Sequence, residues 1–467
     1  MSVSPTALWQ IFDDHSRSLS SRDAIVYGAL RLTYRDLLDR SRAMAASWLD
    51  CARTDREMRI LILLNDPLEI LVSILAAWNL DSTAAVLRPY GAERVPRVYL
   101  DTILPDLIVT ADGVRAPEGD RSSQFLRSPE ECLILGTSGT TAEPKFAAVP
   151  VSCIDLTTST IADDLGINAR DRVQVASPLT YFYGLTGGAL MALRQGATVF
   201  LHAPPFVPSA VQATVRSHEI TVVQGTPSSH RVGFEFWNGT PFESVRIVTQ
   251  GGEPCTPALA ARIASAYPRA RHVQIFGMTE AGRVSHRAIS EPALASNEIG
   301  TPFPHLEWKI VPVDASADFG RIAFRGPSVM LGYVDLSRGY RGIDDEGFFV
   351  TNDLVALSPE GLRFLGRHDR CFKSGGKFVN PAAIESFLVS QDQVYNAVCG
   401  AKAHHLLGQV PVVKVVFEKG AEANVERLRA LCARELEPHL VPREIVAVAE
   451  LPRGSGGKTL LRADLGA

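Results

Sequence analysis

The stretch LILGTSGTTAEPK, residues 133–145, joins an apolar run directly to a loop of glycines and hydroxyl residues. Glycines let the backbone approach a ligand closely, and consecutive N–H groups can cradle phosphate oxygens. Hydroxyl side chains add donors, and the terminal lysine adds a positive charge. The GxxxxGK[ST] pattern of P-loop NTPases is absent, so the segment predicts a different kind of phosphate-binding loop. A polar turn after a strand is the alternative, but such a turn needs neither the lysine nor so many hydroxyl groups.

Strand and helix patterns alternate around this loop. Arg59–Leu64 is a short apolar run typical of a buried strand, and Pro67 favours a helix start before Leu68–Leu80. Thr33 followed by Asp36 is typical of a helix N-cap with an acidic third position. Further strands are predicted at Glu131–Leu135, Arg172–Ala176, Thr198–Leu201, Val222–Gln224 and Val245–Thr249. This alternation predicts an α/β fold with layered helices and mostly parallel strands.

The pattern changes in the last third of the chain, where short strands separated by glycine and acidic turns are expected. They are predicted at Arg321–Arg325, Phe348–Val350 and Leu362–Leu365. A compact α+β arrangement follows, with helices at Pro381–Ser390 and Asn424–Leu436 and strands at Val394–Gly400 and Val412–Glu418. We therefore predict a large N-terminal layered α/β domain, residues 1–366, and a small mobile C-terminal α+β domain, residues 367–467.

Bulk properties narrow the class of function. The chain has 467 residues, a formal net charge of -4 and a pI near 6.3, which gives no reason to expect a nucleic-acid partner. Its 7 cysteines are scattered and form no CxxC pair, which favours a reduced compartment, the cytoplasm. No apolar run approaches the roughly 20 residues that span a bilayer, so membrane insertion is not expected. No signal peptide is expected at the N-terminus.

The loop resembles the phosphate-binding loop of the class I adenylate-forming superfamily, which comprises acyl- and aryl-CoA synthetases, peptide-synthetase adenylation domains and luciferases. The resemblance in motif is closest to the acyl- and aryl-CoA synthetases. The family loop usually has the pattern TSGTTGxPK, and this chain departs from it at Ala142, where a positive φ would cost about 1 kcal/mol. Other family motifs are matched in chain order: GGEP at 251–254, QIFGMTE at 274–280, TND at 351–353, GRHD at 366–369, FKSGGKFVNPAAIE at 372–385 and PRGSGGKTLLR at 452–462.

The resemblance implies a role for each matched position. Lys458, Thr279 and Glu280 are implied to be catalytic, and Glu280 is the implied ligand of Mg²⁺. Asp369 is the implied interdomain hinge, and Gly375 and Gly376 are implied to line a thiol tunnel. The residues implied to bind ATP or AMP are Thr137, Ser138, Gly139, Thr140, Thr141, Lys145, Gly251, Gly252, Glu253, Phe276, Gly277, Met278, Asp353 and Arg367.

The acid pocket is expected around the segment SPLTYFYGL, residues 177–185, which resembles the PLxHxxGL segment of the same synthetases with Tyr181 in place of histidine. No aspartate that would hold an α-ammonium group stands between Ala176 and Gly187, so a free α-amino acid is not expected. An apolar pocket with a few hydroxyl donors suits an aromatic, cyclic or short-chain acid. The residues predicted to line it are Tyr181, Phe182, Tyr183, Gly184 and Ser229.

The resemblance implies a ligase that activates a small carboxylic acid with ATP and Mg²⁺ as an acyl-adenylate and passes the acyl group to a thiol. The thiol belongs to coenzyme A or to the phosphopantetheine of an acyl or aryl carrier protein, which the sequence does not separate. Transfer to an amine, giving an amide, is one alternative, and a nucleotide-binding pseudo-enzyme is another. Single motifs also have plainer interpretations: Phe276 is compatible with core packing, and Lys458 with a solvated basic tail. Their joint order along the chain favours the enzyme.

Overall fold

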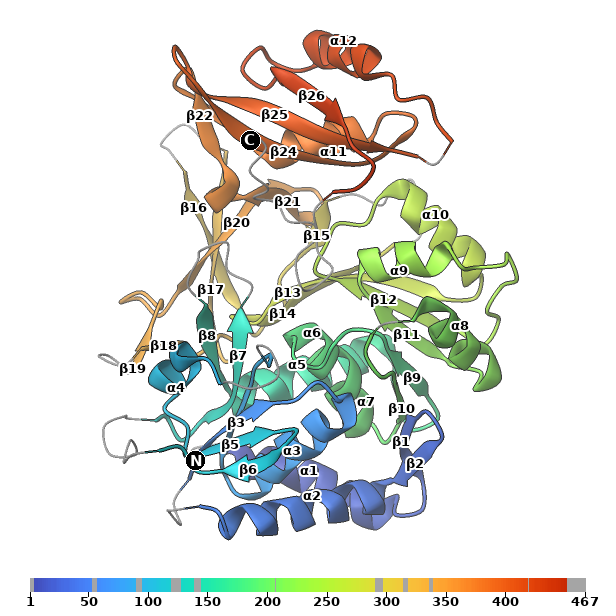
Figure 1. The fold of residues 1–467 in the computed structure, drawn as a ribbon, viewed down its shortest axis with the longest axis vertical. Coiled ribbons are helices and arrows are strands. Elements are labelled where there is room, and N and C mark those ends of the chain that lie inside the picture. Colours follow the sequence, from blue (N-terminus) through green and yellow to red (C-terminus); the bar gives the residue numbers. More distant parts are fainter. Residues whose placement is uncertain are drawn as a thin grey trace. The chain divides into compact units, whose positions relative to one another are not determined.

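The computed structural model describes residues 4–52, 57–89, 95–118, 127–137, 144–205, 207–289, 297–313, 318–335, 339–418 and 420–451. These residues fall into two compact units (Figure 1). The first unit contains the residues up to Trp308 and Phe324–Phe349, and the second contains Lys309–Ala323 and the residues from Val350 onward. The predicted division after Gly366 therefore lies inside the second compact unit. Compactness does not test mobility, so the mobile domain of residues 367–467 stays a prediction.

The first sheet of unit 1 has a parallel centre and two antiparallel edge strands. Its strand order is β14-β13-β12-β11-β9-β10-β1-β2, with β2 and β14 antiparallel to their neighbours. The strands are β1 Asp23–Tyr27, β2 Leu30–Thr33, β9 Arg172–Val175, β10 Thr198–Leu201, β11 Val222–Gly225, β12 Ile247–Gly251, β13 Arg271–Met278 and β14 Gly282–Ala288. The expectation of mostly parallel strands in an α/β fold is confirmed.

The second sheet of unit 1 contains the strands on either side of the predicted phosphate loop. Its order is β19-β18-β8-β7-β4-β3-β5-β6, and β7, β4, β3 and β5 are parallel. The strands are β3 Arg59–Leu63, β4 Thr83–Val86, β5 Leu107–Thr110, β6 Gly113–Arg115, β7 Glu131–Thr137, β8 Lys145–Pro150, β18 Gly332–Asp335 and β19 Gly339–Arg341. All residues of β3 are buried, as expected for a central parallel strand with both faces covered.

The helices of unit 1 begin where the sequence patterns indicate. Thr33 and Asp36 form a complete capping box on α2, and Asp66 caps α3, whose first residue is Pro67. A short strand, β15 Glu298–Gly300, also belongs to this unit. The helices are α1 Pro5–Ser18, α2 Tyr34–Leu49, α3 Pro67–Asn79, α4 Arg97–Ile103, α5 Val151–Leu165, α6 Phe182–Gly184, the π-helix η1 Leu185–Leu190, α7 Met191–Arg194, α8 Pro208–Ser217, α9 Pro227–Phe234 and α10 Pro257–Ala266.

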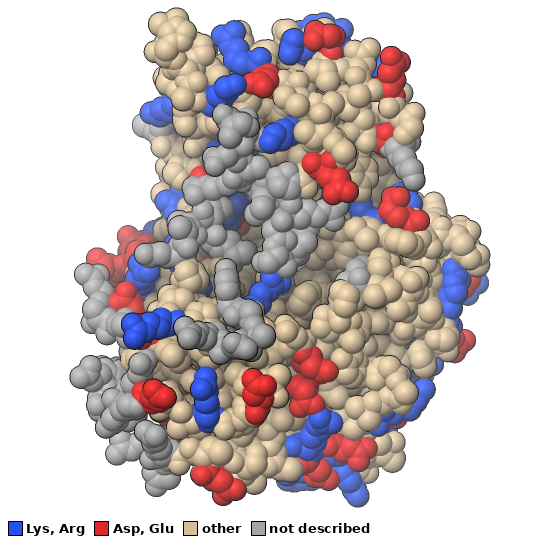
Figure 2. Space-filling model, viewed as in Figure 1, with Lys and Arg blue, Asp and Glu red and all other residues tan. Residues whose placement is uncertain are grey.

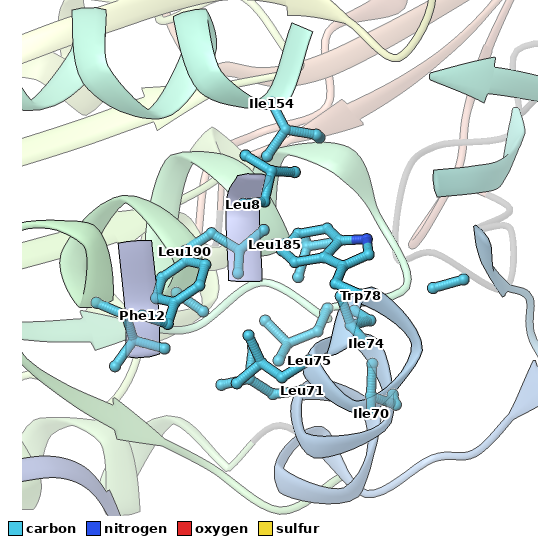
Figure 3. Close-up of a cluster of buried hydrophobic side chains, with 14 of the residues drawn as sticks. Leu8, Phe12, Ile70, Leu71, Ile74, Leu75, Trp78, Ile154, Leu185 and Leu190 are labelled. Carbon is cyan, nitrogen blue, oxygen red and sulfur yellow. The ribbon is translucent and has the colours of Figure 1, made fainter. Parts of the chain in front are cut away.

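A large apolar core lies between these helices and the sheets. Figure 3 shows part of it: Leu8 and Phe12 of α1 and Ile154 of α5 lie beside side chains of α3 and η1. Trp78 of α3 is fully buried, and its indole N–H donates to the carbonyl of Cys132 on β7 at 2.9 Å. This contact ties the strand that precedes the phosphate loop to the core of the unit.

Unit 2 contains two small sheets and the helices that cover one of them. Strands β21, β20, β17 and β16 are neighbours in the first sheet, and β20 and β21 pair antiparallel. The second sheet has the order β23-β22-β25-β24, with β26 beside β25. The elements are β16 Glu307–Pro312, β17 Phe319–Arg325, β20 Phe349–Ser358, β21 Gly361–Arg367, η3 His368–Arg370, β22 Phe372–Ser374, β23 Lys377–Val379, α11 Pro381–Val389, β24 Val394–His404, β25 Gly408–Phe417, α12 Val425–Glu435 and β26 Glu444–Ala447.

The described surface carries both signs of charge. Figure 2 shows acidic and basic side chains interspersed on one face, without a large field of one sign among the described residues. On this face, an anionic ligand would have to be recognised by local groups rather than by a general positive field. Among the described residues, no helix is both long enough and apolar enough to cross a membrane.

Candidate active site

The predicted phosphate loop is flanked by a β-hairpin. Strands β7 and β8 pair antiparallel, with Thr137 opposite Lys145, and the Thr137 hydroxyl donates to the Lys145 carbonyl at 3.5 Å. This pairing places the two ends of the loop side by side. Of the residues implied to bind phosphate, Ser138, Gly139, Thr140 and Thr141 lie outside the described residues, as does Ala142.

Three segments that are far apart in the sequence meet beside this hairpin. The Tyr333 hydroxyl donates to Oε1 of Glu280 at 2.7 Å, and the Lys145 Nζ lies 5.2 Å from the centre of the Tyr333 ring. The Phe349 ring packs edge-on against Tyr333, with 6.1 Å between the ring centres. The backbone of Glu280 is also held, because its carbonyl accepts from Met330 N at 2.9 Å. Lys145 and Glu280, the implied Mg²⁺ ligand, therefore both contact Tyr333.

The FGMTE segment lies at the end of β13, where β14 turns back against it. Gly277 pairs with Arg283, and a Cβ at Gly277 would lie 2.6 Å from the Gly282 carbonyl oxygen. Only glycine fits at that distance, which explains its place in the segment. Phe276 is half-buried, and Met278, Thr279 and Glu280 follow it with intermediate exposure.

The GGEP turn follows β12 on the neighbouring strand. Gly252 has a φ of +83°, a conformation that glycine adopts without strain. The Glu253 carboxylate accepts from the Ser228 hydroxyl at 2.6 Å and from Arg231 at 3.2 Å, both on α9. The turn is therefore fastened to α9 through the side chain of Glu253. A ligand that bound here would meet a turn whose shape is already set.

The residues predicted to line the acid pocket divide into two groups. Tyr183 and Tyr181 have specific polar contacts: the Tyr183 hydroxyl donates to Thr249 at 3.1 Å, and the Arg88 guanidinium lies 4.6 Å from the centre of the Tyr181 ring. Burial raises the pKa of both phenols. Phe182, in contrast, packs in the apolar core.

Two other pocket residues have a local structural role. A Cβ at Gly184 would lie 2.5 Å from the Pro178 carbonyl oxygen, so glycine is required by the close chain crossing. The Ser229 hydroxyl accepts from Thr226 N at 2.8 Å within the capping box of α9. These contacts leave contact with the acid an untested prediction for both residues.

In unit 2, one arginine joins two of the implied site residues. Arg367 donates to Asp353 at 3.1 Å and binds Asp369 through two nitrogens, at 3.2 and 3.0 Å. Asn352 donates to the same Asp369 carboxylate at 3.4 Å. The implied hinge residue Asp369 is therefore an ion-pair partner of Arg367, which is implied to bind ATP or AMP. Its side chain is 17% exposed, so it is not a freely solvated group.

The implied thiol-tunnel residues form the turn of a hairpin. Gly375 and Gly376 connect β22 to β23 and have φ values of +56° and +81°. Two successive positive φ values are typical of a type I′ turn, which favours glycine. Gly375 N also donates to the Leu407 carbonyl at 3.0 Å, which fixes this turn to the one before β25. Lys458, the implied catalytic lysine, lies outside the described residues.

Tyr333 is the contributor that the sequence analysis missed. It stands in the segment Gly332–Asp335, which forms β18 and pairs with β8. An isolated aromatic residue in a short strand predicts core packing, and nothing in its spacing points to a carboxylate 53 positions away. The contact follows only from the pairing of β18 with the hairpin strand β8.

The sequence and this geometry define an AMP-binding enzyme. Residues 98–334, more than half of the chain, match the family of AMP-binding enzymes, and residues 383–458 match the AMP-binding enzyme C-terminal domain. The chain belongs to the AMP-binding enzyme family.

Relatives within this family are CoA ligases. The 2-succinylbenzoate–CoA ligase of Bacillus velezensis is 25% identical over 94% of both chains. The 4-coumarate–CoA ligase 3 of Oryza sativa is 28% identical over 81% of this chain and 71% of its own length. The mitochondrial medium-chain acyl-CoA ligase ACSF2 of Pongo abelii is 26% identical over 76% of this chain, and the match spans only 61% of that ligase.

Solved structures share the fold. ATP-bound MatB from Rhodopseudomonas palustris superposes with a TM-score of 0.84 at 20% identity, covering 98% of this chain and 97% of MatB. The O-succinylbenzoate coenzyme A synthetase MenE from Bacillus subtilis, in complex with AMP, gives a TM-score of 0.77 at 22% identity and covers 98% of both chains. These likenesses confirm the predicted fold, a large N-terminal and a small C-terminal domain.

Proposed function

We propose that this enzyme activates a carboxylic acid with ATP as an acyl-adenylate and then transfers the acyl group to a thiol. The observation that carries the proposal is the meeting of Lys145, Tyr333 and Glu280 next to the ends of the phosphate loop. A cation beside the loop, such as Lys145, can bind the phosphates of a nucleoside triphosphate, and an oriented carboxylate, such as Glu280, can bind its metal ion. The CoA-ligase relatives and the AMP and ATP complexes of MenE and MatB support the same reaction.

The first half-reaction forms a mixed anhydride. An oxygen of the acid carboxylate forms a bond to the α-phosphorus, and the bond from that phosphorus to the bridging oxygen breaks, releasing pyrophosphate. Negative charge accumulates on the α-phosphate oxygens, where Lys458 and Thr279 would donate hydrogen bonds. Glu280 would hold Mg²⁺, which adds positive charge next to the phosphate oxygens when bound. Glu280 fits this role, because Mg²⁺ is commonly bound by one or two carboxylates together with substrate phosphates.

The nucleoside would be held by the remaining motif residues. Phe276 would stack on adenine beside the turn of Gly251, Gly252 and Glu253. The Asp353 carboxylate would accept hydrogen bonds from the ribose hydroxyls. Arg367 already fixes the orientation of Asp353 through its 3.1 Å contact. Preorientation of this kind lowers the entropy that binding must overcome.

The second half-reaction breaks the acyl–phosphate bond. The thiol sulfur forms a thioester with the acyl carbon, and AMP leaves. We assign the acceptor to coenzyme A or a carrier-protein phosphopantetheine, entering beside the Gly375–Gly376 turn after the C-terminal domain rotates about Asp369. The acid is aromatic, cyclic or short-chain, as supported by the succinylbenzoate and coumarate ligases among the relatives. We propose the cytoplasm as the location, since all 7 cysteines are unpaired.

An ATP–pyrophosphate exchange screen over a library of carboxylic acids tests the first half-reaction. We expect exchange with a simple acid and, in Lys458→Ala, a loss of roughly 10²–10³-fold. The same variant should still form thioester from supplied acyl-adenylate, because no pyrophosphate leaves in that step. Arg443→Ala, an arginine outside every matched motif, is the control and should retain exchange. Equal loss of both half-reactions in Lys458→Ala, or no exchange with any acid in the native enzyme, would contradict the proposal.

A further inference from the structure

Arg283 on β14 is a buried cation whose donors are unused. Its side chain is 2% exposed, and its Nε, Nη1 and Nη2 atoms have no hydrogen-bond partner among the described residues. The nearest carboxylate oxygen, Asp164 Oδ2, lies 3.9 Å from Nη1, beyond hydrogen-bond distance. Burial lowers the pKa of the guanidinium to about 10. Buried guanidinium groups normally have hydrogen-bond partners, so this one calls for a ligand.

An unused acceptor lies beside these donors. Asp164 comes from the end of α5, and its Oδ2 has no hydrogen-bond partner among the described residues. The Nδ1 of His286 is 3.4 Å from the same oxygen but does not complete a hydrogen bond with it. The Phe303 ring closes one side, with its centre 5.3 Å from the Arg283 guanidinium. A partly buried cluster thus offers several donors and one acceptor.

A β-bulge places this cluster on the face of the sheet that carries the predicted acid pocket. Ile275 pairs with His286, but Gly277 pairs with Arg283, so β14 has an extra residue between them. The bulge turns Arg283 and His286 to the same face, consistent with their approach to one carboxylate.

The same face reaches Tyr183 through two strand pairings. Ile275 pairs with Gly251 of β12, and a Cβ at Gly251 would lie 3.5 Å from the Tyr183 ring. The Tyr183 hydroxyl is fixed on Thr249, two residues earlier on the same strand and therefore on the same face. Tyr183 contacts this face at β12, and Arg283 lies on the same face at β14, two strands further from β11.

We propose that Arg283 determines acid specificity by binding a hydroxyl group at the end of the acid remote from its reacting carboxylate. This inference rests on the proposed function. A hydroxyl accepts from the guanidinium and donates to Asp164 Oδ2, so one group satisfies both unused partners. An apolar group would leave the desolvated guanidinium without a hydrogen-bond acceptor, and a second carboxylate would face the charge of Asp164.

The test compares aryl acids of graded chain length, each with a hydroxyl, a methyl or a carboxyl group at the remote end. We expect kcat/KM for exchange to favour the best hydroxy acid over its methyl analogue by about tenfold to a hundredfold. Arg283→Met should reduce this ratio to near one. Arg287→Met, on the same strand but opposite Gln274 on the other face, is the matched control and should keep the ratio.

A second variant keeps the inference testable if Arg283→Met does not fold. Asp164 has a side chain that is 31% exposed, so Asp164→Asn should fold, and it should lower the ratio of kcat/KM for the hydroxy acid to that for the methyl acid. Equal kcat/KM for hydroxyl and methyl acids in the native enzyme, or a preference for the second carboxylate, would overturn the inference while leaving adenylation intact. Absence of exchange with every acid would instead remove the proposed function. Calorimetric binding of the hydroxy acid that is unchanged in Arg283→Met would also overturn the inference.

Discussion

At the scale of single residues, the Tyr333 hydroxyl is the group most specifically placed to orient the implied metal ligand. Tyr333→Phe removes its 2.7 Å bond to Glu280 and keeps the ring that contacts Lys145 and Phe349. A hydrogen bond to a charged group contributes about 1.5–3 kcal/mol, so we expect roughly a tenfold to hundredfold loss of adenylation. The loss should be partly restored at high Mg²⁺ concentration. A Mg²⁺ dependence identical to that of the native enzyme would contradict the orienting role.

A second tyrosine provides a matched comparison. The Tyr340 hydroxyl donates to Glu131 at 2.8 Å, and Glu131 is fully buried in an ion pair with Arg59. Tyr340→Phe should lower the free energy of unfolding by about 1–3 kcal/mol, because a buried carboxylate loses a donor. Adenylation per folded molecule should stay unchanged. Urea titration and active-site counting separate the two effects, and lost activity with full stability would place Tyr340 in the site instead.

Motif order supplied the candidate site residues, and it did not predict their contacts. The order of GGEP, FGMTE, TND and GRHD along the chain was enough to select Glu280, Asp353, Arg367 and Asp369. Tyr333 and Asp164 were not selected, because each reaches its neighbours through strand pairing or helix packing across a long sequence separation. Asp164 lies on α5, before the segment Ala176–Gly187, so the absence of an aspartate from that segment does not describe every carboxylate near the predicted pocket.

At the scale of elements, strong local patterns were predictable and irregular ones were not. The capping box at Thr33 and the proline before α3 define helix starts through local contacts alone. The expected strand at Val245 begins at Ile247 instead, because Val245 N closes a turn onto the Phe242 carbonyl. The β-bulge opposite Phe276 and Gly277 cannot be recognised from the spacing of apolar residues in the sequence. It nevertheless determines on which face of the sheet the Arg283 side chain lies.

Two buried histidines, His230 and His272, predict a pH-dependent stability. His230 on α9 and His272 on β13 are almost fully buried, and burial lowers the pKa of each to about 4. The unfolded chain takes up these protons below about pH 6.5, but the folded chain does so only near pH 4. Stability from the neutral imidazoles is therefore present above pH 6.5 and lost as the pH falls toward 4. We expect a loss of a few kcal/mol, measured by urea unfolding.

A variant isolates the histidine contribution from that of the carboxylates. His272→Gln keeps a polar side chain of similar length but cannot be protonated. Its free energy of unfolding should fall less steeply than that of the native protein between pH 6.5 and 4. Parallel profiles for the two proteins would show that the buried imidazoles do not control acid stability.

The Gly375–Gly376 turn permits an element-scale test of the second half-reaction. Gly375→Ala places a side chain at a φ of +56°, which costs about 1–2 kcal/mol, and its Cβ would lie 3.1 Å from the Leu407 side chain, which must move by a few tenths of an ångström. We expect slower thioester formation with unchanged pyrophosphate exchange. Gly420→Ala, also at positive φ but in open space between β25 and α12, is the control. Slower exchange in Gly375→Ala would contradict a role confined to the thiol step.

At the scale of the whole molecule, the change in the pattern of strands and helices predicted two domains with a boundary after Gly366. The two compact units of the structure are divided at other positions. Strand β20 pairs with β21 and so joins the second unit before the GRHD motif. Lys309–Ala323 joins the same unit, although it precedes residues of the first. The assignment of this segment to the second unit depends on pairing between strands that are far apart in the sequence, which cannot be predicted from amino-acid composition. The mobile part and the compact unit are therefore expected to differ in extent.

The hinge prediction tests that difference directly. Proline holds φ near −65°, so Asp369→Pro should block a rotation about this residue. If the two half-reactions need two orientations of the C-terminal domain, only one of them should survive. Asp369 also pairs with Arg367, so substitution alone removes an ion pair. Asp369→Ala removes the same pair while leaving the backbone free, which makes it the matched control.

Pyrophosphate exchange reports the first step, and thioester formation from supplied acyl-adenylate reports the second. We expect the alanine variant to lose only a few-fold in either step, because a partly exposed ion pair contributes about 1 kcal/mol or less. The proline variant should match it in one step and fall far below it in the other. The surviving step identifies the orientation that a φ near −65° at residue 369 permits. Equal rates for the proline and alanine variants in both steps would mean that the chain does not turn at Asp369, and the hinge would then have to lie at another position.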